Sequence, residues 1–287
     1  MKTSVTKTST EGNQMTIKRS TLLAGLAICA NMALAPTGHA DGLVEAGQLL
    51  VGSDLTYPPY DYLDDANQPA GFDAELATAL AKAANLQVKF VDTRFENLII
   101  GVSSDQFDVI ASTLYVKPER AKRVDFLPYM KSGISIAVLQ GSEFAFRTLE
   151  ELCGHSFASV KGSAWLQRVE ELNQTTCAGD EIDAREFPTA PEATQALLSG
   201  GVDAQVEDSA VLGEAARKLN GRIVMTNEDQ LYPVIVALGL KKGNTELAEI
   251  LENAMSVIKA NGEYRALLTK YNVAAPTDGE FRAAVGQ

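Results

Sequence analysis

The chain has 287 residues, of which 25 are Lys or Arg and 37 are Asp or Glu, and its formal net charge is −12 at pH 7. Because an acidic surface repels phosphate groups, this balance argues against nucleic acid and anionic lipid as partners. It does not decide the charge of a small ligand, since one arginine in a cleft can oppose the global field. The length is sufficient for two moderate domains.

The first forty residues have the pattern of a secretory signal. Lys18 and Arg19 precede an apolar stretch at 22–34, and small residues follow up to Ala40. Positive, apolar and small segments in this order predict export with cleavage after Ala40, so 1–40 is assigned to a signal peptide. The apolar stretch is too short to span a bilayer.

Two details of this segment leave alternatives. A polar extension precedes the signal, so either Met1 or Met15 is the start of the natural chain. Cys29 raises a lipid-anchored alternative, but Ile28 stands where the attachment motif requires a small residue. A lipid anchor is therefore not expected.

Once the signal is removed, two cysteines remain. Cys153 and Cys177 form an even pair in a chain bound for an oxidising compartment, which predicts a disulfide. Closing that loop of about 25 residues would add roughly 3 kcal/mol of stability by the chain-entropy model. A metal site is the alternative, but only His155 lies near in sequence, so neither a metal nor a cofactor is expected.

Strands and helices alternate along the exported chain. The first part predicts strand 49–52, turn 56–62, helix 72–84, strand 88–91, helix 95–102, strand 107–111 and a turn entering a helix at 117–123. The second part predicts strands 134–139, 156–160, 182–187, 202–206 and 232–240, with helices 165–172, 190–199, 244–259 and 262–271. This alternation argues for an α/β protein with mostly parallel sheets and covering helices, in two units.

The most informative segment is DVIASTLYVKPERAKRVDFLPY, at 108–129. An apolar strand ends in the hydroxyl residues Ser112 and Thr113, and Arg120 follows in a turn. Arginine is a planar, two-pronged donor that suits a carboxylate. Hydroxyls and one arginine at a strand end favour capture of a small anion over nucleophilic catalysis, which needs a neighbouring base.

This segment is the last of three motifs in a fixed order, after VGSDLTYPPYDY at 51–62 and GFDAELATALAKA at 71–83. Together they resemble the polar amino-acid family of bacterial periplasmic solute-binding proteins, the receptors of ABC importers, and the resemblance spans 43–273. It implies a periplasmic location, an amino acid or closely related zwitterion as ligand, and a permease in the inner membrane as partner. A monomer without enzymatic activity is expected.

The resemblance also implies an architecture. It is the two-lobed type II fold of periplasmic binding proteins, with a mostly parallel, helix-covered sheet in each lobe and a two-strand hinge. Lobe 1 is expected to be discontinuous, formed by 41–133 together with 234–287, and lobe 2 to comprise 134–233. Two linkers between lobes favour one bending direction and therefore clamshell closure on a ligand.

Roles follow from the matched positions. Arg120 would grip the ligand α-carboxylate, with help from the backbone N–H near Tyr115 and from a helix N-terminus at Ser163. Thr113 and, from lobe 2, Asp208 would hold the α-ammonium group. A zwitterion that leaves water needs an oppositely charged partner for each of its charges. The combination of Arg120 and Asp208 is therefore physically consistent.

Three further positions would contact the ligand side chain. The rings of Tyr57 and Phe95 would flank it, and Asp54 would meet a basic group. Every assigned residue also has a structural alternative. These are an ion pair of Arg120 with Glu119 or Asp125, helix capping by Asp208, a turn cap by Asp54, and packing roles for Tyr57, Phe95 and Trp165.

The sequence departs from the family pattern at the expected site. Tyr115 stands where relatives often carry a small residue, and it is expected to shrink or reshape the pocket. Ala164 stands where a hydroxyl residue is common, which removes one contact to the carboxylate. The identity of the ligand is therefore not predicted.

Two other functions use the same fold. A periplasmic lyase of the cyclohexadienyl dehydratase type would need an acid in the cleft. Glu207 is adjacent to Asp208, but strand alternation predicts that its side chain faces the opposite side of the strand from Asp208 and so away from the cleft. A sensory module that presents its closed form to a receptor is also compatible, since fold does not decide function.

Overall fold

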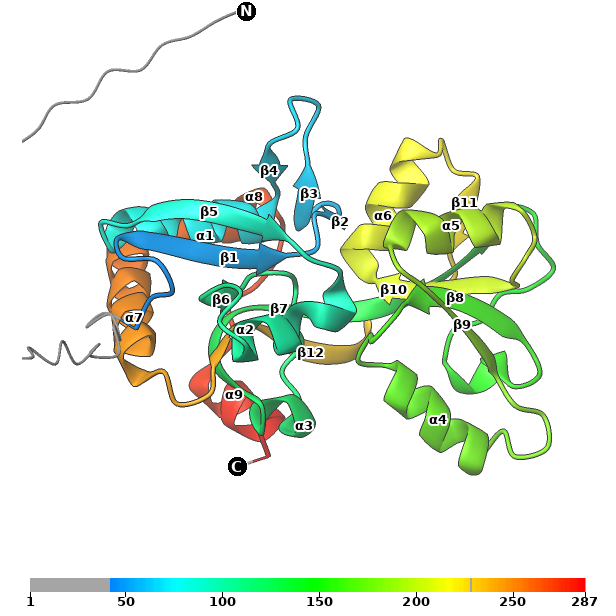
Figure 1. Cartoon of the computed structure of the whole chain (residues 1–287). Coiled ribbons are helices and arrows are strands. Elements are labelled where there is room, and N and C mark those ends of the chain that lie inside the picture. The colour runs from blue at the N-terminus through cyan, green and yellow to red at the C-terminus, as the bar shows by residue number, and fades with distance from the viewer. Residues whose placement is uncertain (1–41, 228, 287) are drawn as a thin grey trace, which may run out of the picture. The chain divides into compact units, whose positions relative to one another are not determined.

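The computed structural model describes residues 42–227 and 229–286 (Figure 1). The predicted signal peptide 1–40, its cleavage after Ala40, both candidate starts and Cys29 lie outside these residues. Within the described part, no helix is both long and apolar enough to cross a membrane. The fold is a two-lobed α/β structure, as expected from the sequence.

One sheet runs through both halves of the described chain. Its strands follow the order β5 (Gln87–Asp92), β1 (Gln48–Ser53), β6 (Val109–Ile110), β12 (Leu231–Lys241), β7 (Val124–Leu139), β10 (Ala204–Asp208), β8 (Ser156–Val160) and β9 (Asp183–Phe187), and β11 (Ile223–Met225) pairs with β7. The outer strands of each half pair in parallel, whereas β7 and β12 run antiparallel to their neighbours.

Helices cover this sheet. They are α1 (Phe72–Ala83), α2 (Leu98–Ser103), α3 (Pro118–Ala121), α4 (Leu166–Gln174), α5 (Ala190–Leu198), α6 (Ser209–Lys218), α7 (Thr245–Ala260), α8 (Glu263–Lys270) and α9 (Asp278–Ala284), with 3-10 turns at Phe95–Asn97 and Glu150–Leu152. In the second half, α5 and α6 lie on one side of the sheet and α4 on the other (Figure 1). A small antiparallel sheet is formed by β2 (Thr56–Tyr57), β3 (Asp61–Leu63) and β4 (Pro69–Ala70).

The two long strands β7 and β12 connect the halves (Figure 1). Strand β7 pairs with β12 from Val124 to Ile134 and with β10 from Ile134 to Ala137. It therefore passes without a break from the first half to the second. The antiparallel pair has the form of the predicted two-strand hinge, while the lobe boundaries at 133/134 and 233/234 stay a prediction.

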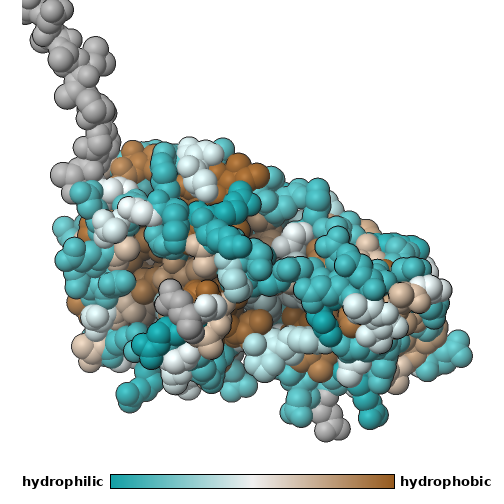
Figure 2. All heavy atoms as spheres, turned by 90° about the horizontal axis from the view of Figure 1, so that it is seen from below, coloured by the Kyte–Doolittle hydropathy of each residue, from teal (hydrophilic) through white to brown (hydrophobic). Residues whose placement is uncertain are grey.

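Helix α1 shows how local sequence builds the first half. Phe72, Leu76 and Leu80 recur at helical spacing and are fully buried. Gly71 precedes the helix with a φ of 105°, and a Cβ there would lie 2.3 Å from the carbonyl oxygen of Tyr60. Only glycine fits at this entry. The face of the molecule seen in Figure 2 is mostly hydrophilic, with hydrophobic residues showing in patches.

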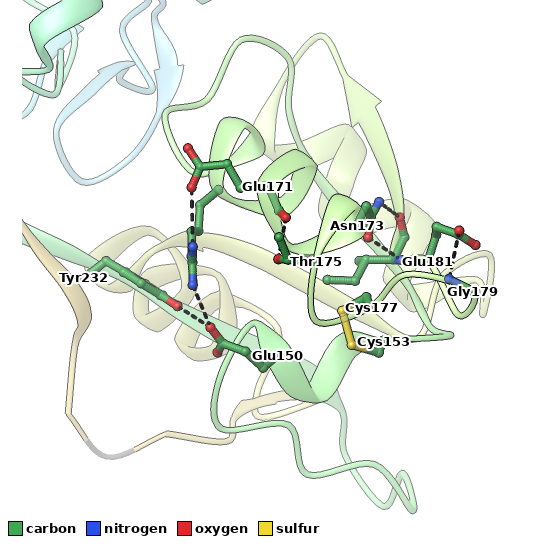
Figure 3. The surroundings of a disulfide bond; sticks show 11 residues. Glu150, Cys153, Glu171, Asn173, Thr175, Cys177, Gly179, Glu181 and Tyr232 are labelled. Carbon is green, nitrogen blue, oxygen red and sulfur yellow. Dashed lines mark hydrogen bonds and ion pairs between the residues drawn. A yellow bond between two sulfur atoms is a disulfide. The ribbon is translucent and has the colours of Figure 1, made fainter.

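The predicted disulfide is confirmed. Cys153 and Cys177 are joined across a separation of 24 residues, so the bond ties the segment before β8 to the segment after α4 (Figure 3). Nearby, the Tyr232 hydroxyl of β12 donates to Oε1 of Glu150 at 3.3 Å. The disulfide between Cys153 and Cys177 also rules out the alternative of a metal site at these cysteines.

We expect replacement of both Cys153 and Cys177 by serine to lower the free energy of unfolding by about 3 kcal/mol, because the unfolded chain gains the entropy of an open loop. Urea unfolding of both proteins measures this difference. Reductant should shift the midpoint of the wild type and leave that of the double variant unchanged. Equal midpoints without reductant would show that the bond contributes no stability.

Candidate functional site

A cavity of about 30 Å³ lies between the two halves, beside the carboxyl ends of the parallel strands β1 and β6. Ligands of open α/β sheets bind at such strand ends. Eight of the nine predicted binding residues line it: Asp54, Tyr57, Phe95, Ser112, Thr113, Tyr115, Arg120 and Ser163. Thr56, Val160, Ala164 and Trp165 complete the lining. Asp208 is not part of it.

A larger cavity of about 610 Å³ shares Tyr115, Ala164 and Trp165 with the first. It lies on the side of α9 and β12, and its lining is mainly apolar. Size alone would favour this cavity. The smaller one is the better candidate site, because the predicted anion-binding residues gather there at strand ends.

Arg120 is the cation of the smaller cavity. Its Nη1 donates to the carbonyl oxygen of Tyr115 at 3.0 Å, and its Nη2 donates to that of Gly162 at 3.1 Å. Its guanidinium lies 5.4 Å from the centre of the Phe95 ring. Part of the residue reaches solvent, but the surrounding protein desolvates the guanidinium and lowers its pKa to about 10.

No carboxylate of the described residues forms an ion pair with Arg120. The structural alternative predicted a pairing with Glu119 or Asp125, but Asp125 instead pairs with Lys242 at 2.6 Å. A guanidinium has five N–H donors, and two of them are used here by backbone carbonyls. Arg120 therefore retains donors for an anion, and its ligand role stays a prediction.

The hydroxyl residues at the end of β6 hydrogen-bond to buried acids. Thr113 donates to Oδ2 of Asp73 through both its backbone N–H, at 2.6 Å, and its hydroxyl, at 3.0 Å. Ser112 donates to Asp61 and accepts the N–H of Asp54 at 3.0 Å. Burial raises the pKa of Asp73 to about 6, against the lowering effect of its hydrogen bonds.

Sequence analysis missed Asp61 and Asp73 as supports of the site. Asp73 is an acid in the first turn of α1, and its carboxylate also accepts the hydroxyl of Tyr129. Burial, followed by repulsion from Asp73, raises the pKa of Asp61 well above its usual value. Both side chains fix the strand end that carries Ser112 and Thr113.

Asp54 and Ser163 also have internal partners. Oδ1 of Asp54 lies 2.7 Å from Nη1 of Arg94, and its Oδ2 accepts the N–H of Phe95 at 2.9 Å. Burial raises the pKa of Asp54, while its hydrogen bonds and Arg94 lower it. The Ser163 hydroxyl donates to the carbonyl oxygen of Val160 at 2.6 Å. The predicted ligand contacts of both residues stay predictions.

Asp208 lies behind the cavity wall and is fully buried. Its Oδ2 accepts the Tyr115 hydroxyl at 2.7 Å and also that of Ser132, and its Oδ1 accepts the N–H of Ala210 at 3.0 Å. The last contact caps α6, which is the structural alternative stated for this residue. Desolvation raises its pKa, while these hydrogen bonds lower it. Its contact with a ligand stays a prediction.

Glu207 contacts the cavity wall, contrary to the expectation that it faces away. Its Oε2 accepts the Tyr57 hydroxyl at 2.8 Å, and its Oε1 accepts the N–H of Val160 at 2.6 Å and the hydroxyl of Ser159 at 3.2 Å. Donors on the neighbouring strand β8 therefore hold the carboxyl beside two lining residues. Burial raises its pKa to about 8.

The family model for bacterial extracellular solute-binding proteins, family 3, matches residues 49–274. The chain belongs to this family. A curated relative, the L-cystine-binding protein TcyJ of Escherichia coli K12, is 28% identical over 251 residues, covering 87% of this chain and 91% of the relative. The family and fold predicted from the three motifs are thus confirmed.

Two solved structures give the same fold. An ancestral arginine-binding protein bound to arginine is 31% identical and has a TM-score of 0.73, with 78% of this chain and 98% of that chain covered. The ancestral amino acid-binding protein AncCDT-1, a precursor of cyclohexadienyl dehydratase, is 32% identical with a TM-score of 0.69, covering 78% and 95%. All three relatives are binding proteins by name.

Proposed function

We propose that this protein is the periplasmic binding component of an ABC importer, and that it captures an amino acid or a closely related small carboxylate on Arg120. The observation that carries the proposal is the guanidinium of Arg120 in the cavity between the halves, without an acidic partner among the described residues. The family description and the names of the relatives support the transport role.

The chemistry of Arg120 supports a carboxylate ligand. A desolvated cation without a counterion is costly, and an entering carboxylate would offset that cost with two parallel charge-assisted hydrogen bonds. The rings of Tyr57, Phe95 and Trp165 in the lining would then cover the ligand body. Arg120 is therefore assigned the role of carboxylate anchor.

Several polar contacts join the halves around the cavity. Arg120 reaches Gly162, Lys117 donates to the carbonyl oxygen of Ala164 at 2.8 Å, and Lys161 pairs with Glu96 at 2.7 Å. A cavity of about 30 Å³ is far below the roughly 300 Å³ of the smallest typical ligand pockets. Ligand entry therefore requires the proposed lobes, 41–133 with 234–287 and 134–233, to separate by bending of β7 and β12.

A thermal-shift screen of the purified protein against the common amino acids, opines and quaternary amines tests this function. A ligand that binds only the folded form should raise the melting temperature by about 5–10 °C at 100 times its Kd. A strain that lacks the gene should lose uptake of this ligand and regain it when the protein is restored. If the role is sensory, the deletion should change chemotaxis toward the ligand and not its uptake. A cooperative melt that no compound shifts would overturn the proposal.

A lyase is the second candidate, favoured by one observation. The raised pKa of Glu207, about 8, keeps its carboxyl protonated near neutral pH, next to the Tyr57 hydroxyl in the cavity wall. A protonated acid can assist departure of a hydroxyl group as water. The likeness to AncCDT-1 makes the reaction worth testing. Turnover of prephenate or arogenate that is lost in Glu207→Gln would support this activity, and absence of turnover would exclude it.

A further inference from the structure

Two tyrosine hydroxyls of the first half donate hydrogen bonds to two carboxylates of the second half. Tyr115 donates to Asp208 at 2.7 Å, and Tyr57 donates to Glu207 at 2.8 Å. Both acids are fully buried at the end of β10, and both tyrosines line the smaller cavity. The tyrosines thus separate the cavity from the two acids behind its wall.

Neither acid has an oxygen left without a donor. Asp208 also receives the Ser132 hydroxyl and the Ala210 N–H, and Glu207 also receives donors from Ser159 and Val160. The acceptor positions of these two acids are therefore filled from within the protein.

The lining of the smaller cavity contains one acid, Asp54, and this acid already forms an ion pair. Asp54 has Arg94 at 2.7 Å and accepts the Thr56 hydroxyl, also at 2.7 Å. Arg120 has no such partner among the described residues. The charges that face the cavity are thus one uncompensated cation and one neutralised ion pair, an arrangement that complements a monoanion better than a zwitterion.

We propose that the ligand is a small carboxylate without an α-ammonium group, and that Tyr115 is the residue that excludes the ammonium. The proposal rests on the proposed function, in which this cavity is the ligand site. It names the subclass of ligand: the 2-oxo and 2-hydroxy counterparts of amino acids, rather than the amino acids.

Displacing Tyr115 from Asp208 would be unfavourable. Its ring is buried and packs edge-on against Trp165, with the ring centres 5.9 Å apart. Its backbone is held by a bridge to Val236 and by the hydrogen bond from Arg120. A rotated ring would lose its packing against Trp165, and its hydroxyl would need a new acceptor.

An ammonium that left Tyr115 in place would find neutral oxygens and only the carboxylate of Asp54, which is already paired with Arg94. The Thr113 hydroxyl already donates to Asp73 and could accept one hydrogen bond, but a hydroxyl does not neutralise a full charge. Burying an ammonium without an acidic partner is strongly unfavourable. Compounds with an oxo or hydroxyl group at that position avoid this cost.

Calorimetric titration of the purified protein tests the ligand class. The probes are matched sets of three compounds that differ only at the α-carbon. They are L-leucine with 4-methyl-2-oxopentanoate and 2-hydroxy-4-methylpentanoate, L-phenylalanine with phenylpyruvate and phenyllactate, and the corresponding sets for the other common amino acids. We expect an oxo or hydroxy acid to bind at least about tenfold more tightly than its amino counterpart.

Variants of Tyr115 test its role. Tyr115→Ser should free Asp208 and shift the preference by at least about tenfold toward the amino acid, and Tyr115→Phe should shift it in the same direction while retaining the ring. Tyr271→Phe is the matched control, because it removes a hydroxyl that donates to a carboxylate, Glu75, away from the cavity. Its preference should equal that of the wild type.

The outcomes separate the two proposals. Tighter binding of an amino acid than of its oxo and hydroxy counterparts by the wild type would overturn the ligand class and leave the transport function standing. An unchanged preference in both Tyr115 variants would overturn the role of Tyr115. Binding of neither class by the folded protein would overturn the proposed function together with this inference.

Discussion

Arg120→Ala should weaken binding of the ligand found by screening at least 100-fold, without destabilising the ligand-free protein. Each hydrogen bond between charged groups contributes about 1.5–3 kcal/mol, so loss of two corresponds to at least 100-fold. The ligand-free protein should melt at the same temperature or higher, because the variant removes a desolvated cation that has no acidic partner among the described residues. Calorimetry and thermal unfolding measure the two effects.

Matched variants show whether the effect belongs to this guanidinium. Arg123→Ala removes an exposed arginine three residues away and should leave the affinity unchanged. Arg120→Lys retains the charge but loses the planar pair of donors, so its affinity should lie between those of the wild type and Arg120→Ala. Wild-type affinity in Arg120→Ala would defeat the assignment of the carboxylate anchor.

The local pattern of the sequence was sufficient to predict helix α1 and the disulfide. It predicted only 134–139 of β7, which begins at Val124. No strand was predicted for 124–133, which contains Pro128, but the pairing of β7 with β12 extends the strand over these residues. Helix α9 was also missed. Its Phe281 packs in a small cluster around Ile235, a contact between segments far apart in sequence.

The part of the site formed by one continuous motif was predictable from the sequence. The hydrogen bonds between residues of different halves were not. The run that contains Ser112, Thr113 and Arg120 fixes one wall of the cavity by its own strand end and turn. The Tyr115 hydroxyl donates a hydrogen bond to Asp208, which is 93 residues away in the sequence. No periodicity reports such a pairing, although the unusual size of Tyr115 at its position indicated that the pocket differs from those of relatives.

Burial of several acids close to the cavity has a consequence for stability. Desolvation raises the pKa of Asp73, Glu207 and Asp208 above their usual values. An acid whose pKa is higher in the folded state binds more protons when folded. Its contribution to stability is therefore complete below the unfolded pKa and declines as the pH rises through the folded one.

Glu207→Gln should remove a large share of this pH dependence. The Glu207 pKa rises from 4.5 to about 8 on folding, so the wild type should lose on the order of 4 kcal/mol of stability between pH 4.5 and pH 8 from this group. Glutamine keeps an acceptor for the Val160 N–H and has no charge to desolvate. The variant should thus gain stability relative to the wild type as the pH rises.

Urea unfolding of both proteins at pH 5, 7 and 9 measures this change. The effects of Asp73 and Asp208 are common to both proteins and largely cancel in the difference, so the difference reports Glu207. Glu252→Gln, at an exposed position of α7, should give a difference that does not vary with pH. Parallel stability curves for Glu207→Gln and the wild type would mean that Glu207 is already ionised in the folded protein at neutral pH. It could then not act as a proton donor, and the lyase alternative would lose the observation that favours it.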